Sequence, residues 1–469
     1  MTRLRKGSLL AALLGMTGVV SALTPGQVTE KIVCKETPAQ SYALYLPPGY
    51  TTARPWPVLY LLDARGNALV PIERFRAPAE EFGWILVSSY NSQSDTNDDP
   101  NTPAMRAMWK DTHSTLALDE RRTYVGGFSG GGRASVAMAL ALPKVFAAVI
   151  SCGAGFPDAT APIRQAPPFG FFGTIGDRDM NYYEMRSLDE KLSAVKAPHR
   201  IAFFDGPHQW APEPVARAAI VWMELEAMKA GTRPRDPERI ASLQAQAASA
   251  AGAAESAGRT AEAAVLYAHA AEDFRGLADT ADLESTAKRL AESPEVRNAV
   301  KEARARDEHD RATLSRLAGI VRHAAEQSEV PAAGFVAVQL GIPALRKKAA
   351  SDTSPEERLS AERILANLRA QTGFYLPQQM LDKRELAKAR MLYSVAAEID
   401  PASPNPDYNL AAASARFGDA AQACKDLDRA VAKGFHNFDD LDKDSDFDPI
   451  RTTSVFKSWL AHASPPAPR

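Results

Sequence analysis

A serine between glycines is the strongest chemical signal in the sequence. Ser129 is the centre of a Gly-x-Ser-x-Gly pattern at residues 127–131. The pattern follows an expected strand at Thr123–Gly127 and opens an expected helix at Gly131–Leu142. Such a strand–turn–helix corner is so sharp that the residues beside the serine must be small, and the hydroxyl projects from the strand end. The pattern predicts a nucleophilic serine, with the backbone N–H of Gly130 directed at a developing oxyanion.

A serine hydroxyl is a weak nucleophile and needs a neighbouring base, which a third group orients. Where the serine sits on such a turn, the chain order is serine, then an acid, then histidine. Two histidines follow Ser129 in the first half of the chain. His199 precedes the last expected strand, Ile201–Phe204, whereas His208 follows it, at the end where the serine lies. We therefore expect His208 to be the base.

The third group is expected on the strand before the histidine strand. Asp177 and Asp179 both follow the expected strand Phe169–Gly173, which is the usual position of the acid. The aspartate that does not contact the histidine would cap the next helix or bond within the loop. Asp158, after the preceding strand, is a third candidate.

A second donor to the oxyanion is expected from the loop that follows the strand Val58–Leu62. That loop begins at Asp63. We expect the backbone N–H of Ala64 or Arg65 to act together with that of Gly130.

Short apolar runs and helical patterns alternate through residues 28–230, and they must position these side chains. The first two expected strands follow each other closely and suit a hairpin, while the later ones alternate with helices and imply parallel crossovers. The prediction is a doubly wound, mostly parallel α/β sheet with an antiparallel start. The other expected strands are Lys31–Lys35, Ser41–Leu46, Ile85–Ser89 and Ala147–Ser151, and the other expected helices are Ala104–Ala117, Tyr183–Val195 and Pro212–Lys229.

Beyond a charged, proline-containing stretch at residues 231–237, the chain is rich in alanine and nearly devoid of strand signals. We expect a helical region over residues 238–386 and a second helical unit over 387–460. In the second unit Tyr393, Ala396 and Ala397 recur as Leu427, Ala430 and Val431, a shift of 34 residues. This spacing resembles the tetratricopeptide repeat. Such repeats commonly bind peptides or other proteins, so a peptide or protein partner is expected for this all-α unit.

The first 22 residues have the three parts of a secretory signal peptide. Basic residues precede a short apolar run at Ser8–Val20, and small residues end at Ala22. The expectation is an exported protein, periplasmic or secreted, without a transmembrane segment after cleavage, because no later stretch reaches the roughly 20 apolar residues that a span needs. The three cysteines, Cys34, Cys152 and Cys424, are too scattered for a disulfide framework or a zinc site.

Composition and charge bear on which partners and cofactors to expect. A formal net charge of −2 and the lack of a lysine or arginine run give no reason to expect a nucleic-acid partner. We also expect no metal ion among the groups that act at the site.

Four segments together resemble the polyhydroxybutyrate-depolymerase and feruloyl-esterase branch of the α/β-hydrolase superfamily. The resemblance covers roughly residues 38–228 and implies ester cleavage through an acyl-enzyme, without a metal or an organic cofactor, on a small-molecule or polymeric ester. The resemblance also favours Asp179 as the acid, because Gly176 and Asp179 match the Gly-x-x-Asp turn of relatives. The chain departs from the family pattern at Asp63, which stands where many relatives carry histidine. The segments are Tyr42–Tyr50, Pro57–Gly66, Gly126–Gly132 and Gly206–Trp210.

Two other functions remain open at this point. A binding protein could carry a degenerate hydrolase core and use its helices to recruit a peptide. A serine peptidase would use the same three side chains, because one triad serves both ester and peptide cleavage.

Overall fold

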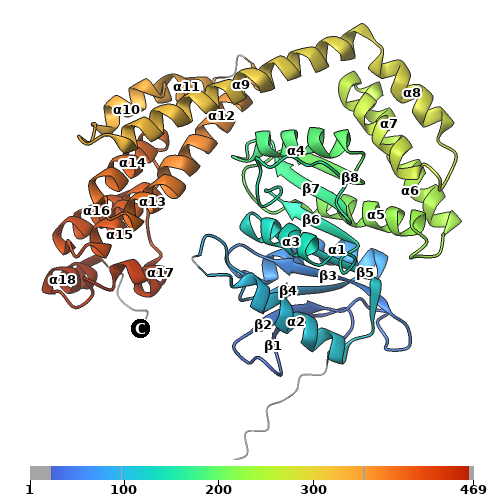
Figure 1. The fold of residues 1–469 in the computed structure, drawn as a ribbon, viewed down its shortest axis with the longest axis horizontal. Helices are drawn as coiled ribbons and strands as arrows, with labels where there is room; N and C mark the ends of the chain where they lie inside the picture. Colours follow the sequence, from blue (N-terminus) through green and yellow to red (C-terminus); the bar gives the residue numbers. More distant parts are fainter. Residues whose placement is uncertain (1–22, 97, 352–353, 464–469) are drawn as a thin grey trace, which may run out of the picture.

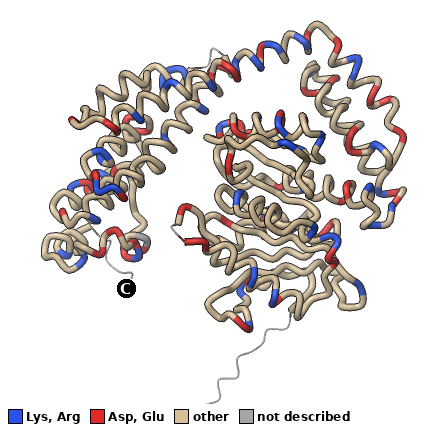
Figure 2. Tube along the Cα trace, in the orientation of Figure 1, with Lys and Arg blue, Asp and Glu red and all other residues tan. Residues whose placement is uncertain are grey.

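The computed structural model describes residues 23–96, 98–351 and 354–463, which form an α/β half followed by an all-helical half (Figure 1). The expected signal peptide at residues 1–22 lies outside the described residues. None of the helices in these ranges combines the length and the apolar character that crossing a bilayer needs. Lysine and arginine are interspersed with aspartate and glutamate along both halves (Figure 2).

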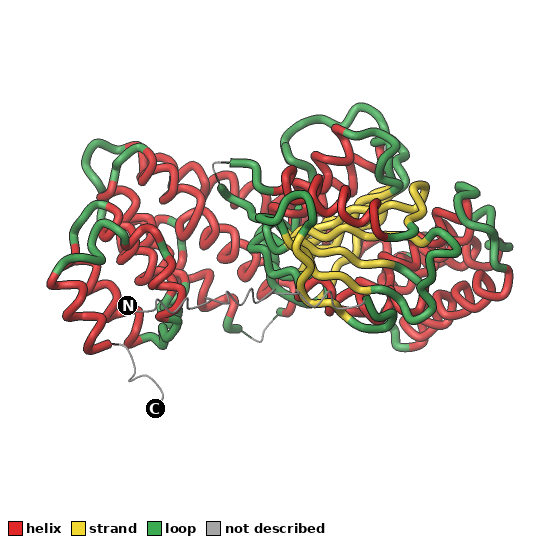
Figure 3. The backbone as a smooth tube through the Cα atoms, turned by 90° about the horizontal axis from the view of Figure 1, so that it is seen from below, coloured by secondary structure: helices red, strands yellow, loops and turns green. Residues whose placement is uncertain are grey.

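One eight-stranded sheet forms the centre of the α/β half, in the order β1-β2-β4-β3-β5-β6-β7-β8. Strand β2 runs antiparallel to both of its neighbours, and all the other neighbouring pairs are parallel. Figure 3 shows the sheet as one twisted layer among helices. This is the α/β-hydrolase fold, with the expected antiparallel start. The strands are β1 (Val28–Val33), β2 (Ser41–Tyr45), β3 (Trp56–Leu62), β4 (Ile85–Ser89), β5 (Leu118–Phe128), β6 (Ala148–Cys152), β7 (Gly170–Gly176) and β8 (His199–Phe204).

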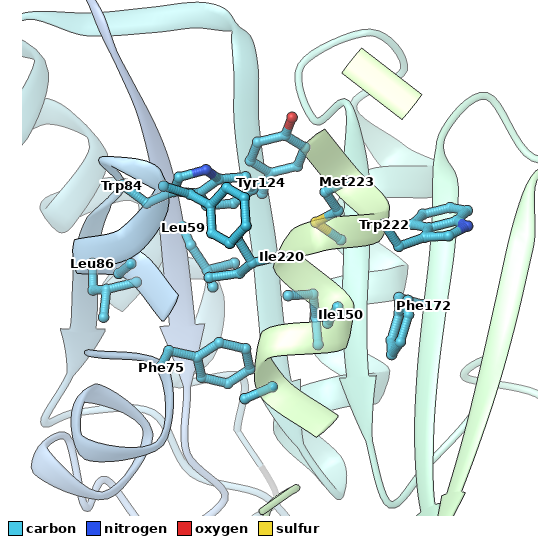
Figure 4. Packing of buried hydrophobic residues seen from close by; sticks show 14 of the residues in the cluster. Leu59, Phe75, Trp84, Leu86, Tyr124, Ile150, Phe172, Ile220, Trp222 and Met223 are labelled. Carbon is cyan, nitrogen blue, oxygen red and sulfur yellow. The ribbon is translucent and has the colours of Figure 1, made fainter. Parts of the chain in front are cut away.

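Helices cover both faces of the sheet, so the central strands are buried on each side. Leu59 and Leu61 of β3 face one apolar cluster, shown in Figure 4, which α1 and α5 complete. Val58 and Tyr60 of the same strand face a second cluster with α2, α3 and α4. The alternation of side chains along a strand divides the core in this way. These helices are α1 (Leu69–Phe82), α2 (Asn101–Thr115), α3 (Gly130–Ala141), α4 (Tyr182–Ala194) and α5 (Glu213–Lys229).

Helix α1 is the one element of this half that the sequence analysis missed. It contains Pro71 near its start and Pro78 in its interior, and an interior proline removes a backbone hydrogen bond. Burial outweighs that cost, since Ile72 and Phe75 are almost completely buried against the sheet.

The second half is helical, as the alanine-rich sequence predicts. Helix α9 spans 33 residues and runs from the α6–α8 group to the remaining helices (Figure 1). Helices α12 and α13 are joined without a break by a π-helical turn, η1. The elements are α6 (Pro237–Ser256), α7 (Thr260–Phe274), α8 (Ala281–Ala291), α9 (Pro294–Glu326), α10 (Ala333–Gln339), α11 (Ile342–Ala349), α12 (Pro355–Ala370), η1 (Gln371–Tyr375), α13 (Leu376–Asp382), α14 (Leu386–Ile399), α15 (Asn405–Arg416), α16 (Ala420–Ala432), α17 (Phe438–Lys443), a 3₁₀ turn η2 (Ser445–Phe447) and α18 (Ser454–Ala463).

Helices α6 and α7 belong to the core of the α/β half. Ile240 and Leu243 of α6 and Phe274 of α7 join the cluster that α1 and α5 complete. Arg200 of β8, itself buried, donates to Asp273 of α7 at 2.6 Å. Helices α6 and α7 are therefore packed onto the α/β half rather than tethered to it by a linker.

A fragment of residues 28–230 is expected to aggregate or to unfold without cooperativity. Ile240, Leu243 and Phe274 are only 4%, 5% and 2% exposed. Burial of three such side chains contributes about 5–9 kcal/mol, which is most of the roughly 5–15 kcal/mol that keeps a domain folded. Thermal unfolding of the fragment, compared with that of residues 28–280, measures the effect. A soluble short fragment with full activity would show instead that the helices form an independent module.

Candidate active site

Ser129 occupies the sharp turn between β5 and α3. Its backbone has a φ of 55° and a ψ of −121°, a strained conformation for a residue with a side chain. The turn also brings β5 close to α3. A side chain at Gly127 would collide with the backbone of Gly131, and one at Gly131 would collide with the carbonyl of Leu62. The glycines of the motif are therefore a steric requirement of the turn.

His208 lies in the loop after β8, at the same end of the sheet. Its Nε2 is 3.0 Å from Ser129 Oγ, within the range expected for a nucleophile and its base. The ring of Phe128 lies 4.6 Å from the imidazole, centroid to centroid. The other histidine, His199, begins β8 and contacts Asp189 at 3.1 Å. The structure thus brings His208 to the serine and places His199 elsewhere.

Asp179 completes a chain of hydrogen bonds. Its Oδ2 is 2.8 Å from His208 Nδ1, and its Oδ1 accepts the N–H of Asn181 at 2.8 Å. Its side chain is fully buried, whereas that of His208 is 22% exposed. A buried acceptor on Nδ1 leaves Nε2 free to accept the serine proton.

The other two aspartates lie apart from the imidazole. Asp177 Oδ1 accepts the N–H of Gly206 at 3.0 Å and so ties the acid loop to the histidine loop. Asp158 is exposed and bonds within its own loop, to Thr160.

The expected oxyanion donors belong to two different loops, one after β3 and one at the start of α3. Among the described residues, neither the Gly130 N–H nor the Ala64 N–H has a hydrogen-bond acceptor. The N–H of Arg65 is already occupied, because it donates to Asp63 Oδ1 at 2.8 Å. Ser94 joins the two loops, since its N–H donates to Ala64 O at 3.0 Å and its side chain lies against Gly130. Of the two donors expected beside Gly130, Ala64 is the one that remains available.

Asp63 is a site residue whose role the sequence did not indicate. It is 4% exposed, and its Oδ1 also accepts the N–H of Asn67 at 3.0 Å. Its Oδ2 accepts Trp210 Nε1 at 2.7 Å. The carboxylate therefore shapes the Ala64 turn and links it to the loop of His208.

Asp63→Ala is expected to lower kcat by up to about 10²-fold, because loss of a positioned oxyanion donor costs about 10²–10³-fold. The substitution leaves three N–H groups without their acceptor and frees the Ala64 turn. Trp210→Phe is the matched control, since it removes the hydrogen bond to Asp63 Oδ2 and keeps an aromatic ring against Phe75 and Phe128. Steady-state kinetics of both variants on one ester give the comparison. Equal losses in the two variants would assign the effect to packing rather than to the turn.

Cys152 is the thiol nearest the serine turn, and its carbonyl accepts the Ser129 N–H at 2.8 Å. Burial raises the pKa of Cys152 to about 11, so the thiol stays protonated at neutral pH and is a poor nucleophile. In the described ranges no group of three or more histidine, cysteine, aspartate or glutamate side chains could hold a metal ion.

The helical half reaches the acid loop, a contact that the sequence analysis did not foresee. Arg363 and Asn367 of α12 donate to carbonyls on either side of Asp179. Tyr375, in η1, lies close enough for the charges of Asp95 and Asp179 to act on its hydroxyl, although burial is the main cause of its raised pKa. These residues show no recognisable pattern in the sequence.

No protein-family model and no curated protein matches the chain. Solved structures similar to it include an S-formylglutathione hydrolase of Staphylococcus aureus, with 18% identity, 39% of this chain and 90% of the other covered, and a TM-score of 0.32. A fluorophosphonate-binding serine hydrolase of the same organism has 16% identity, 43% and 99% coverage, and a TM-score of 0.35. A feruloyl esterase module of Clostridium thermocellum has 15% identity, 42% and 88% coverage, and a TM-score of 0.34. At such identities and scores these structures say nothing about the activity of this chain.

Proposed function

We propose that the chain is a serine hydrolase that cleaves carboxylic esters, with Ser129 as its nucleophile. The observation that carries the proposal is the unbroken hydrogen-bond chain from Ser129 Oγ through His208 to Asp179, at 3.0 and 2.8 Å. The three side chains come from loops after three different strands and meet at one end of the sheet. A serine with a purely structural role would not need a base and a buried acid joined to it by hydrogen bonds in this order.

In the first half-reaction Ser129 Oγ attacks the ester carbonyl carbon while His208 Nε2 takes the hydroxyl proton. The carbonyl oxygen becomes an oxyanion, which the N–H groups of Gly130 and Ala64 bind in preference to the ground-state carbonyl. The tetrahedral intermediate then collapses. The alcohol leaves with the proton that His208 returns to it, and the acyl group stays on Ser129.

Water completes the cycle. His208 removes a proton from the water that attacks the acyl-enzyme, and it returns this proton to Ser129 Oγ as the carboxylic acid leaves. Asp179 remains ionised throughout; it holds the imidazole in the correct tautomer and stabilises the imidazolium.

Labelling with a fluorophosphonate probe tests the nucleophile, because the probe reacts with an activated serine. We expect one label per chain, on Ser129. A panel of acyl and aryl esters, run beside matched amides, then separates esterase from peptidase activity. Turnover of the amides alone would replace the ester proposal with a peptidase, and absence of labelling would favour the degenerate binding protein.

We further propose that the protein is exported. The proposal rests on the basic, apolar and small-residue segments within residues 1–22. Expression of the full chain in a Gram-negative host, followed by fractionation and N-terminal sequencing, tests it. A mature N-terminus at Leu23 outside the cytoplasm is expected, and an uncleaved cytoplasmic chain contradicts it.

We also propose that α14–α16 form a tetratricopeptide-like unit. The 34-residue shift relates Tyr393 to Leu427 and Ala396 to Ala430, and all four are buried between the helices. Helix α15 packs against both α14 and α16. Small residues at repeated, buried positions are what such stacking requires.

A further inference from the structure

Helix α12 contacts the loop that carries Asp179 at two points. Arg363 Nε donates to the carbonyl of Asp177 at 2.5 Å, and Asn367 Nδ2 donates to that of Met180 at 3.4 Å. The guanidinium of Arg363 also lies 3.8 Å from the centre of the Tyr182 ring. The two donors are four residues apart and so share one face of the helix.

These contacts bracket Asp179 without touching it. One carbonyl lies two residues before the aspartate and the other lies one residue after it. Within the α/β half the same loop is tied chiefly to the histidine loop, through Arg178 N–H to Gly206 O at 3.0 Å and Gly206 N–H to Asp177 Oδ1 at 3.0 Å. Helix α12 therefore supplies an anchor from outside both catalytic loops.

A buried carboxylate fixes α12 relative to the α/β half. Asp310 of α9 is 3% exposed and accepts hydrogen bonds from Tyr183 of α4 and from Ser360 of α12, the latter at 2.8 Å. Arg186 of α4 adds a contact to Asp307 of α9 at 3.0 Å. Because one side chain binds both halves, the position of α12 is coupled to that of α4, which starts just after the acid loop.

We propose that Arg363, on the helical half, is a positioning residue for the catalytic acid. It acts through the backbone of residues 177–182 and keeps Asp179 within hydrogen-bond distance of His208. A misplacement of about 1 Å in a catalytic constellation can cost about 10²-fold in rate. This inference rests on the proposed function, since it gives the helical half a part in the same site.

Arg363→Ala is expected to lower kcat by about 10–10²-fold with little change in KM. The matched control is Arg311→Ala, which removes another arginine of the helical half; it pairs at 3.7 Å with Glu190, in the later part of α4, and makes no hydrogen bond to the described residues of the acid loop. That variant is expected to stay within about twofold of the parent. The second-order rate constant for fluorophosphonate labelling of Ser129 and the turnover of one ester are measured for both full-length proteins.

A double-mutant cycle with Asp179→Asn separates positioning from general damage. If Arg363 acts through Asp179, Arg363→Ala has less than about twofold effect once Asp179 is already replaced. An equal loss in both backgrounds overturns the proposal. Melting temperatures verify that each variant is folded. Should Arg363→Ala fail to fold, Arg363→Gln and Asn367→Ala enter the same cycle.

The two proposals fail in different ways. If the parent protein is not labelled, the hydrolase proposal is wrong and the positioning role falls with it. If the parent is labelled and Arg363→Ala is labelled just as fast, the positioning role alone is wrong.

Discussion

Ser129→Ala is expected to reduce kcat/KM for an ester by about 10³-fold or more. The substitution removes the atom that forms the acyl-enzyme, so the remaining N–H groups of Gly130 and Ala64 can stabilise only a direct attack by water. KM is expected to change little, because the methyl group of alanine leaves the oxyanion donors in place. Steady-state kinetics and mass spectrometry of the fluorophosphonate-treated variant measure both effects.

Ser94→Ala is the control for this result. The Ser94 hydroxyl lies beside Gly130, but its acceptor is the carbonyl of Ala64 at 3.4 Å, and among the described residues it makes no hydrogen bond to a histidine. Its N–H bond to Ala64, which holds the turn, survives the substitution. A small effect is expected. Loss of labelling in Ser94→Ala together with retained labelling in Ser129→Ala would transfer the nucleophile to Ser94.

Asp179→Asn is expected to lower kcat by about 10⁴-fold, the loss typical when the acid of a triad becomes an amide. The amide keeps the shape of the side chain but presents an N–H to His208 Nδ1, which forces the tautomer that cannot take the serine proton. Kinetics near neutral pH on one ester give the loss.

Asp177→Asn is the matched variant, and a change of a few fold at most is expected. The amide oxygen still accepts the Gly206 N–H, so the contact between the two loops persists. If Asp177→Asn were the more damaging substitution, Asp177 would be the acid and the hydrogen bond of Asp179 would serve only the loop.

The sequence predicts the α/β half well because its signals are local. Glycines on both sides of Ser129 admit few backbone conformations, and the order of strands places Asp179 and His208 at the same end of a parallel sheet. The strand bounds differ by a few residues, as in β5, which begins at Leu118 rather than Thr123. Strand ends depend on the neighbouring strand, which the local pattern does not contain.

The parts that escaped prediction depend on contacts across long stretches of chain. Arg363 and Asp177 are separated by 186 residues, and Trp210 and Asp63 by 147. An arginine on a charged helix is ordinarily a solvated residue, and only the contact of α12 with the acid loop gives it a backbone carbonyl to bind. The sequence analysis did not predict α1, because an interior proline such as Pro78 is a local signal against a helix. Burial of Phe75 against the sheet stabilises the helix in spite of that signal.

The long separation in sequence between Arg363 and the acid loop also determines the order in which the parts of the site are synthesised. A chain leaves the ribosome from its N-terminus, and early segments begin to fold before later ones exist. Ser129 and His208 are therefore synthesised well before Ile240, Leu243 and Phe274 are available to close the core, and before α12 can anchor the acid loop. With the proposed roles, a chain that ends before α12 carries its nucleophile, base and acid but lacks the anchor of the acid loop, which is added only when residues 355–370 have been made. Such a shorter chain is expected to fall short of full activity.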